Sequence, residues 1–251
     1  MSRRFAQHSL LFVLTILAPV SAQTTPASRA VTPARGHFLL VGGGKFSTEM
    51  SEEFLRLAGG KKARIVVIPS ATPWASGRAA SNRWRALGAE TSVLHVKSKQ
   101  EAADPKLYTS LDNATGVWFG GGDQGLLADL FAGTPLVEKL KAILTRGGAV
   151  GGFSAGASVV TKVMVRGRGE SEGFGLLEDL IIDQHFTQRK RLGRLERLID
   201  KHPKMVGYGI DESTALILSE GVIRVLGDGA VTRCKVKEQP VRLTKNGPAS
   251  P

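Results

Sequence analysis

The chain has 251 residues, of which 42% are hydrophobic and 22% charged, as is ordinary for a soluble globular protein with a sizeable core. Its formal net charge is +12, which either favours an acidic ligand or has no specific meaning. It carries no zinc-ligand spacing and no aromatic RNA-binding signature, and only 6% of its residues are aromatic. These features exclude the common nucleic-acid-binding modules, and we expect no nucleic-acid partner.

The N-terminal segment, residues 1–22, predicts an export signal. Two arginines open it, an apolar run covers residues 10–17, and Val20-Ser21-Ala22 is typical of a cleavage site, with the cut after Ala22. The apolar run is short for a membrane span, so we expect no stable membrane anchor, with an uncleaved anchor as the alternative. Residues 23–35 indicate a flexible leader. We therefore expect a secreted or periplasmic protein in which residues 36–251 form a single α/β domain.

Short apolar runs alternate with helical stretches through most of this domain. The alternation favours an α/β fold with a mostly parallel central sheet flanked by helices. In chain order, the first half is expected to contain a strand over 37–41, a helix from Ser47 to the glycines at 59–60, a strand over 63–68, a helix over 74–87 and strands over 91–96 and 115–119. We then expect a helix after residue 124, a helical pattern over 137–144, a strand over 148–152 and a helix from Ala157.

The pattern changes after about residue 205. Strands are expected over 214–218, 222–226 and 230–236, with only short turns between them. This spacing indicates an antiparallel meander that completes the sheet or adds an edge to it. Cys234 is the single cysteine of the chain, so no internal disulfide forms, and its apolar surroundings predict a buried thiol that is a poor nucleophile.

The strongest local motif is Gly152-Phe153-Ser154-Ala155-Gly156, which follows a predicted strand and opens a predicted helix. A sharp strand-to-helix turn lifts a serine oxygen clear of the sheet, and small neighbours give the strained turn room. The backbone N–H of Ala155 is then placed to stabilise a developing oxyanion. The motif predicts Ser154 as a nucleophile.

A serine nucleophile needs a base. Beyond the predicted signal, the histidines are His37, His95, His185 and His202. His37 and His95 lie in predicted strands, and His202 lies at a helix end beside a proline. His185 follows the apolar run 180–182, at the carboxyl end of a strand, where the sites of α/β proteins gather. We therefore expect His185 to be the base, with a structural loop histidine as the alternative.

The base needs an orienting carboxylate. Four candidates lie near predicted strand ends, at Asp123, Asp183, Asp211 and Glu212, and the residues alone do not choose among them. If Glu212 is the acid, the chain order is serine, histidine, acid. An α/β-hydrolase has the order serine, acid, histidine, so that fold is excluded.

Four ordered motifs resemble those of the cyanophycinase group of serine peptidase family S51, which also contains aspartyl dipeptidase (peptidase E). They are Gly120-Gly121-Gly122-Asp123-Gln124, Gly152-Phe153-Ser154-Ala155-Gly156-Ala157, the thirteen residues from Asp183 to Leu195, and Gly209-Ile210-Asp211-Glu212. The resemblance covers roughly residues 36–230, and the segment from Asp183 is its most specific part. It implies a fold like that of class I glutamine amidotransferases, and a homodimer is compatible with it.

The resemblance also implies roles for individual residues. It implies Ser154 as nucleophile, His185 as general base and Glu212 as its orienting acid, with backbone N–H groups of Gly121 or Gly122 and of Ala155 as the oxyanion hole. The implied substrate pocket contains Gln124, Asp183, Gln184, Gln188, Arg189, Arg191 and Arg194. Guanidinium groups bind carboxylates in pairs of hydrogen bonds, and cyanophycin, a polyaspartate with arginine on each side chain, offers both carboxylates and guanidiniums; Asp183 is placed to meet the latter.

The implied reaction is acyl transfer from an aspartyl peptide to Ser154 and then to water, for which we expect no cofactor and no metal. Phe153 departs from the family, which has threonine there, and a bulky ring beside the nucleophile leaves the exact substrate open. The alternatives are an aspartyl dipeptidase or esterase on the same scaffold, and a secreted binding protein without turnover. The glycine-rich segments 42–44 and 120–122 lack a complete phosphate-binding pattern, so we expect close backbone approach there.

Overall fold

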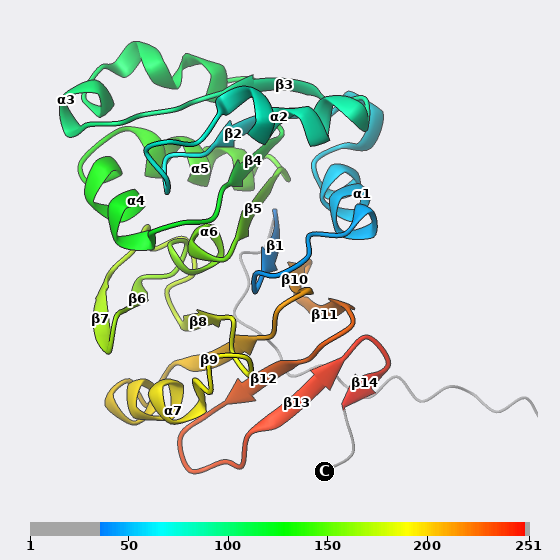
Figure 1. Ribbon diagram of the computed structural model, residues 1–251, viewed down its shortest axis with the longest axis vertical. Coiled ribbons are helices and arrows are strands. Elements are labelled where there is room, and N and C mark those ends of the chain that lie inside the picture. Colours follow the sequence, from blue (N-terminus) through cyan, green and yellow to red (C-terminus); the bar gives the residue numbers. More distant parts are fainter. Residues whose placement is uncertain (1–35, 249–251) are drawn as a thin grey trace, which may run out of the picture.

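A computed structural model describes residues 36–248 and is dominated by two β-sheets (Figure 1). The predicted signal peptide (1–22) and leader (23–35) lie outside the described residues. The larger sheet has the strand order β11-β10-β1-β5-β4-β2-β3 among the described strands. These strands are β1 (His37–Val41), β2 (Arg64–Ile68), β3 (Glu90–Val93), β4 (Gly116–Phe119), β5 (Ala149–Phe153), β10 (Thr214–Ser219) and β11 (Val222–Gly227).

The larger sheet is parallel from β1 to β3, as its apolar, β-branched strands predict, and β10 and β11 extend it in the antiparallel sense. Helices cover both of its faces. They are α1 (Thr48–Leu57) and α2 (Gly77–Ala86) on one face, and α4 (Gln124–Phe131) and α5 (Leu136–Thr145) on the other. Shorter pieces are α3 (Lys99–Ala102), α6 (Ala155–Ser158) and the 3-10 turns Gly60–Lys62 and Pro105–Leu111.

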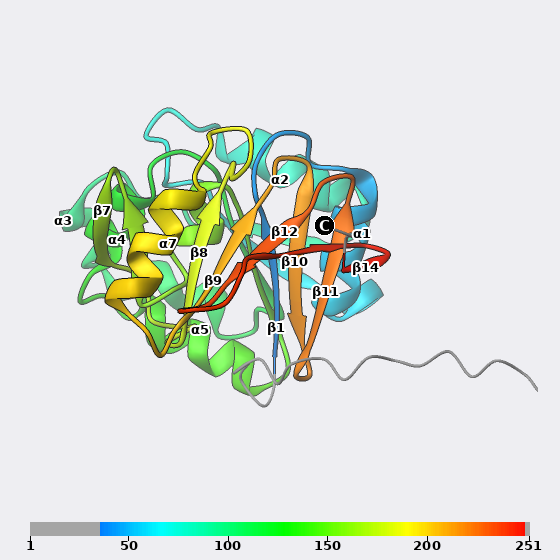
Figure 2. The same ribbon diagram turned by 90° about the horizontal axis from the view of Figure 1, so that it is seen from below.

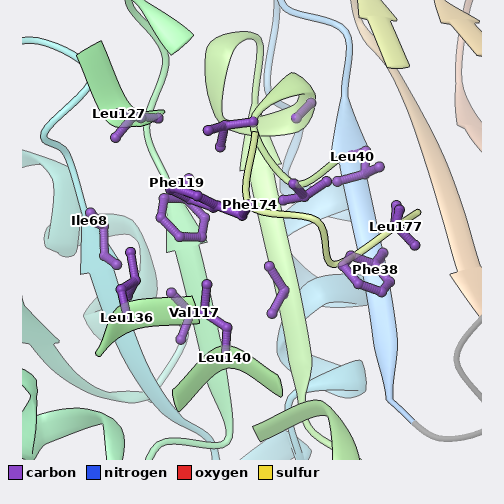
Figure 3. Packing of buried hydrophobic residues seen from close by; sticks show 14 of the residues in the cluster. Phe38, Leu40, Ile68, Val117, Phe119, Leu127, Leu136, Leu140, Phe174 and Leu177 are labelled. Atoms are coloured by element: carbon purple, nitrogen blue, oxygen red, sulfur yellow. The ribbon is translucent and has the colours of Figure 1, made fainter. Parts of the chain in front are cut away.

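Alternation along the strands divides the core between these two faces. Leu39 of β1 packs with the cluster under α1 and α2, whereas Phe38 and Leu40 pack with the cluster that α4 and α5 cover. Figure 3 shows the second cluster, in which Phe119 of β4 meets Phe174 from a later loop, with ring centroids 5.4 Å apart. Side chains buried on both faces fix the sheet, and therefore the carboxyl ends of β1, β4 and β5, where the site lies.

The smaller sheet has the order β14-β13-β12-β9-β8. Its strands are β8 (Leu180–Gln184), β9 (Val206–Ile210), β12 (Val231–Cys234), β13 (Val241–Thr244) and β14 (Gly247–Pro248). The parallel pair β8 and β9 is joined by α7 (Leu192–Lys201), which packs over this sheet (Figure 2) through Leu195, Leu198 and Ile199. A separate hairpin, β6 (Val163–Arg166) and β7 (Gly169–Glu172), lies beside it in Figure 1.

The fold class is as expected, and three local expectations need correction. The meander is broken, because the turn Gly227-Asp228-Gly229 redirects the chain and β12 pairs with β9 in the smaller sheet. The helix expected from residue 74 begins at Gly77, since the Ser76 hydroxyl accepts a hydrogen bond from the N–H of Ala79. The strand expected over 91–96 ends at Val93. Among the described residues, no helix has the length and apolar character needed to cross a membrane.

Candidate active site

Ser154 occupies a strained turn between β5 and α6. Its φ is 52° and its ψ is −106°, a conformation that residues other than glycine rarely adopt. The N–H of Ser154 donates to the carbonyl of Val41 over 2.8 Å, which anchors the turn to β1. A Cβ atom on Gly152 would lie 2.1 Å from the carbonyl oxygen of Gly156, and one on Gly156 would lie 2.6 Å from the carbonyl oxygen of Phe119 in β4, so the turn has no room for a side chain at either glycine. The side chain of Ser154 faces the smaller sheet.

His185 follows β8 and reaches Ser154 from the smaller sheet. Its φ is also positive, at 48°, and its N–H donates to the carbonyl of Gly42 over 2.7 Å. Its Nε2 lies 2.8 Å from Ser154 Oγ, and its Nδ1 lies 2.5 Å from Oε1 of Glu212. Glu212 follows β9, and its own N–H donates to Oε1 of Gln188 over 2.9 Å. Two adjacent strand ends of one sheet thus present a histidine and a carboxylate to a serine held by the other.

The directions of these hydrogen bonds determine how Ser154, His185 and Glu212 can transfer a proton. A carboxylate only accepts, so contact with Glu212 places the imidazole hydrogen on Nδ1. The lone pair of Nε2 then faces the Ser154 hydroxyl, which donates to it. This is the arrangement in which a histidine withdraws a proton from a serine and an acid stabilises the resulting imidazolium.

Two of the other histidines and one of the other acids have different partners, whereas Nε2 of His95 is buried without a hydrogen-bond partner among the described residues. His37 Nδ1 lies 2.8 Å from Ser219 Oγ, and His202 ends α7 and contacts Glu170. Asp123 caps α4 by accepting from the N–H of Gly125. Geometry therefore selects His185 and Glu212 from the histidines and acids that the residues alone leave open.

Asp211, next to Glu212, holds the surrounding loops together. Its buried carboxylate accepts from the N–H of Thr187 over 3.1 Å and from the N–H of Ala230 over 3.2 Å. Arg242 of β13 donates to the same carboxylate over 3.2 Å. Asp211 therefore connects the loop after His185 to β12 and β13. No sequence motif indicates this role of Arg242, because it depends on which strands become neighbours.

The first glycine-rich segment, residues 42–44, leaves room for the ring of His185 because it carries no side chains. A Cβ atom on Gly43 would lie 2.1 Å from Cε1 of His185, and one on Gly44 would lie 2.8 Å from Cβ of Glu212. The expectation of close approach at residues 42–44 is confirmed, and the groups that approach are those of the candidate site. No sequence motif identifies Gly43 as a residue of the site.

The second glycine-rich segment faces the nucleophile from the end of β4. A Cβ atom on Gly122, whose φ is 143°, would lie 2.2 Å from the carbonyl oxygen of Ala71. Thr72 Oγ1 donates to the carbonyl of Gly121 over 3.0 Å and holds the loop in place. Within residues 36–248, no acceptor contacts the N–H groups of Gly121, Gly122 or Ala155. These donors are free to receive an oxyanion.

Asp183 and two arginines form an internal ion group. Asp183 is fully buried, accepts from Arg194 Nε over 2.9 Å and from Arg194 Nη2, and lies 3.2 Å from Arg191 Nη1. Arg191 also donates to Oε1 of Gln184 over 2.6 Å. Burial lowers the pKa of the Arg191 guanidinium, and Asp183 opposes that shift. The placement of Asp183 in a substrate pocket needs correction, because its carboxylate is enclosed and it meets guanidiniums of its own chain.

The remaining residues of the implied pocket lie apart from this group. Gln124 Nε2 donates to the carbonyl of Val165 over 2.9 Å, and Gln188 supports Glu212. Arg189 is exposed on the loop after His185, and its guanidinium contacts no acid among the described residues. Of the three arginines implied to meet substrate, Arg189 therefore has the freest guanidinium.

Phe153 forms an aromatic wall beside the nucleophile. Its half-buried ring lies 6.1 Å from that of Phe46, between centroids, and Phe46 stacks on Trp118 at 4.7 Å. A Cβ atom on Gly121 would lie 2.9 Å from Cδ1 of Phe153, so the ring also touches the loop that carries the free N–H groups. The expected effect of Phe153 on the site has a physical basis in this contact.

The model of peptidase family S51 matches residues 38–226. The chain belongs to peptidase family S51. It is 36% identical over 232 residues to the cyanophycinase of Synechococcus elongatus, an alignment that covers 84% of this chain and 72% of that protein. It is 33% identical to the cyanophycinase of Geminocystis herdmanii, with 85% of each chain covered.

Among solved structures, a peptidase from an acI-B1 actinobacterium superposes with a TM-score of 0.71 at 28% identity, covering 86% of this chain and 97% of that one. A peptidase E-like protein from Listeria monocytogenes shares the fold, with a TM-score of 0.56, 16% identity and coverage of 77% and 99%. The chain is therefore a serine peptidase, a hydrolase of peptide or polypeptide substrates. Strands β12 to β14 follow the part that the family model matches.

Proposed function

We propose that this peptidase hydrolyses cyanophycin to β-aspartyl-arginine dipeptides. The observation that carries the substrate is the likeness to proteins named cyanophycinase, at 33–36% identity over most of the chain. The free guanidinium of Arg189 beside His185 supports it, because each unit of the polymer carries a carboxylate that a guanidinium binds well.

The proposed mechanism follows from the contacts of Ser154. His185 Nε2 takes the hydroxyl proton while Ser154 Oγ attacks the carbonyl carbon of an aspartyl peptide bond. The oxyanion accepts from the N–H of Ala155 and of Gly121 or Gly122. His185 then gives the proton to the leaving amine, which departs and leaves an ester on Ser154. Water, deprotonated by His185, hydrolyses that ester, and the proton returns to Ser154. Glu212 stabilises the imidazolium in both halves of the reaction.

Replacing the nucleophile tests this proposal directly. Purified Ser154→Ala is expected to release β-aspartyl-arginine from cyanophycin at least about a thousandfold more slowly than the unaltered protein. Mass analysis of the soluble products provides the measurement. Undiminished release would exclude Ser154 as the nucleophile, and absence of the dipeptide with the unaltered protein would exclude cyanophycin as the substrate.

An aspartyl dipeptidase or esterase activity is the second candidate, and Phe153 favours it. The ring narrows the space beside Ser154 and Gly121, which suits a smaller acyl group. Comparing kcat/KM for cyanophycin, aspartyl dipeptides and a simple ester separates the two candidates. Labelling of Ser154 by a fluorophosphonate tests the remaining alternative of a binding protein without turnover, because an unactivated serine reacts poorly.

We also propose that the protein acts outside the cytoplasm, in the periplasm or medium, after cleavage at Ala22. The support is the order of charged, apolar and small residues over positions 1–22. N-terminal sequencing of the protein recovered from cell fractions is the test. A cytoplasmic protein that retains residues 1–22 would contradict this localisation and leave the proposed reaction untouched.

A further inference from the structure

Helix α2 presents a row of polar side chains to solvent. Arg78, Asn82 and Arg85 follow one another at spacings of four and three residues, so they share one face of the helix, opposite the buried Trp84. With Gly77, Ser81 and Val93 they line an open hollow of about 510 Å³. Neither guanidinium contacts a carboxylate among the described residues, so both are available to an external acid.

The segment around this helix is strongly basic. Residues 61–99 contain a single acid, Glu90, against eight basic residues, and none of the eight takes part in an ion pair within the described part of the chain. The eight are Lys61, Lys62, Arg64, Arg78, Arg83, Arg85, Lys97 and Lys99. Such a field attracts carboxylates.

Trp74 lies on the loop that leads from β2 into this helix. Its side chain is 90% exposed, whereas the other two tryptophans, Trp84 and Trp118, are buried. The same loop contacts the glycine-rich segment 120–122, which carries the candidate oxyanion-hole N–H groups. Thr72 Oγ1 donates to the carbonyl of Gly121, and the carbonyl of Ala71 accepts from the N–H of Asp123 over 2.9 Å. Trp74 therefore lies on a loop that joins the active-site edge of the larger sheet to the basic face of α2.

A second path connects the same helix to the nucleophile. Arg83 of α2 lies over the ring of Phe46, 4.7 Å from its centroid, and Phe46 contacts the ring of Phe153 beside Ser154. The helix is thus held against the site on one side by Phe46 and on the other by the loop of Trp74. Its basic face continues away from the site without an intervening acid on the helix.

We propose that Trp74, Arg78, Asn82 and Arg85, the α2 surface, bind units of the polymeric substrate beyond the bond being cleaved. This inference rests on the proposed function and adds a second contact region to it. Arg78 and Arg85 bind carboxylates, and the exposed indole of Trp74 stacks on guanidinium groups. Cyanophycin carries one carboxylate and one guanidinium in each unit, so a surface with both kinds of receptor fits it better than a surface with cations alone.

Binding is tested on full-length Ser154→Ala, which keeps the surface and does not consume the polymer. Trp74 is the exposed tryptophan, so addition of soluble cyanophycin is expected to shift and quench tryptophan emission, and Trp74→Phe is expected to remove that change. Adding Arg78→Ala and Arg85→Ala together is expected to weaken binding about tenfold, from the loss of two charge-assisted contacts. The matched control removes the same charge at Lys204 and Lys237, which are exposed and lie outside this segment.

In the protein with Ser154 intact, the Arg78→Ala, Arg85→Ala double variant is expected to raise KM for cyanophycin about tenfold and leave hydrolysis of an aspartyl dipeptide unchanged. Polyaspartate and a DNA duplex, which carry no guanidinium, are the competing ligands. Equal losses in the control variant, or equal binding of DNA and cyanophycin, would overturn the inference in favour of a general charge effect. If the unaltered protein cleaves cyanophycin and the double variant has the same KM for it, the α2 surface does not bind the polymer, and the proposed function stands. Failure of the unaltered protein to cleave the polymer overturns the proposed function instead.

Discussion

The two sheets contribute different parts of one site and are stabilised in different ways. The larger sheet supplies Ser154 and the free N–H groups from strand ends set in an apolar core. The smaller sheet supplies His185 and Glu212, and the segments around them are held by buried charges at Asp183 and Asp211. Removing one partner of a buried ion pair leaves the other charge unpaired in the interior, which lowers the free energy of unfolding. Single substitutions at these charges are therefore expected to weaken the smaller sheet or to disturb the alignment of His185 and Glu212 with Ser154.

The largest effect is expected where the two sheets meet, at Gly43. In Gly43→Ala the new methyl group would overlap the His185 ring, so the imidazole must move away from Ser154. A displacement of about 1 Å lowers kcat by about a hundredfold. Steady-state hydrolysis provides the measurement. Gly60→Ala is the control, since it also has a positive φ but no atom within 4 Å, and it should keep its activity. Full activity in Gly43→Ala would show that the ring is not constrained there.

Asp183→Asn tests how much the buried ion group contributes to the stability of the smaller sheet. The variant leaves the guanidiniums of Arg191 and Arg194 without their common anion, and we expect a loss of about 3 kcal/mol in the free energy of unfolding. Denaturant titration measures it. Asp179→Asn, an exposed residue just before β8, should have little effect. Equal stability of both variants would mean that Asp183 does not support the sheet.

Arg242→Ala tests the link between β13 and the candidate base. Losing the contact with Asp211 should loosen the loop after His185 and lower kcat by about tenfold, with KM for a small substrate unchanged. Arg242→Lys should recover part of the loss, and Arg233→Ala, in neighbouring β12, serves as the control. A drop in thermal stability with unchanged kcat would assign Arg242 a purely structural role.

The smallest effect concerns the larger sheet, through Glu53. Hydrogen bonds from Arg56 and Arg224 lower the pKa of its carboxyl to about 2, from 4.5. Because the folded value is the lower one, the stabilisation is complete above about pH 4.5 and is lost as the pH falls toward about 2. The Tm difference between the unaltered protein and Glu53→Gln should shrink over that range, whereas Glu49→Gln should show no such trend. A constant difference would show that the ion pair adds nothing.

The sequence predicted the larger sheet well and the smaller one poorly, for physical reasons. Strand β1 lies where its apolar run placed it, at residues 37–41, because a buried parallel strand shows its burial in its composition. Burial of Cys234 was also anticipated, and it raises the pKa of the thiol to about 11. The alternation over residues 230–236 correctly indicated a strand but contained nothing about its partner. Pairing with β9 is set by the turn at 227–229 and by Asp211.

The site shows the same division. The motif around Ser154 and the segment after Asp183 identified Ser154 and His185, which the structure brings together, whereas the residues alone left the acid open among four candidates. Local patterns could not show that Asp183 would be enclosed by Arg191 and Arg194, since that depends on α7 folding back over β8. They also could not show that Gly43 would lie against His185, because 142 positions separate the two residues and only the pairing of the sheets joins them.

Strand β1 comes first among the described strands, yet it lies between β10 and β5 in the larger sheet. During synthesis, β1 cannot form its hydrogen bonds to neighbouring strands until β5 and β10 are made, more than 100 residues later. Glu212 and Arg242 emerge later than Ser154. A ribosome-bound chain therefore holds its nucleophile before it can activate it, and proteolytic activity requires synthesis at least as far as Glu212.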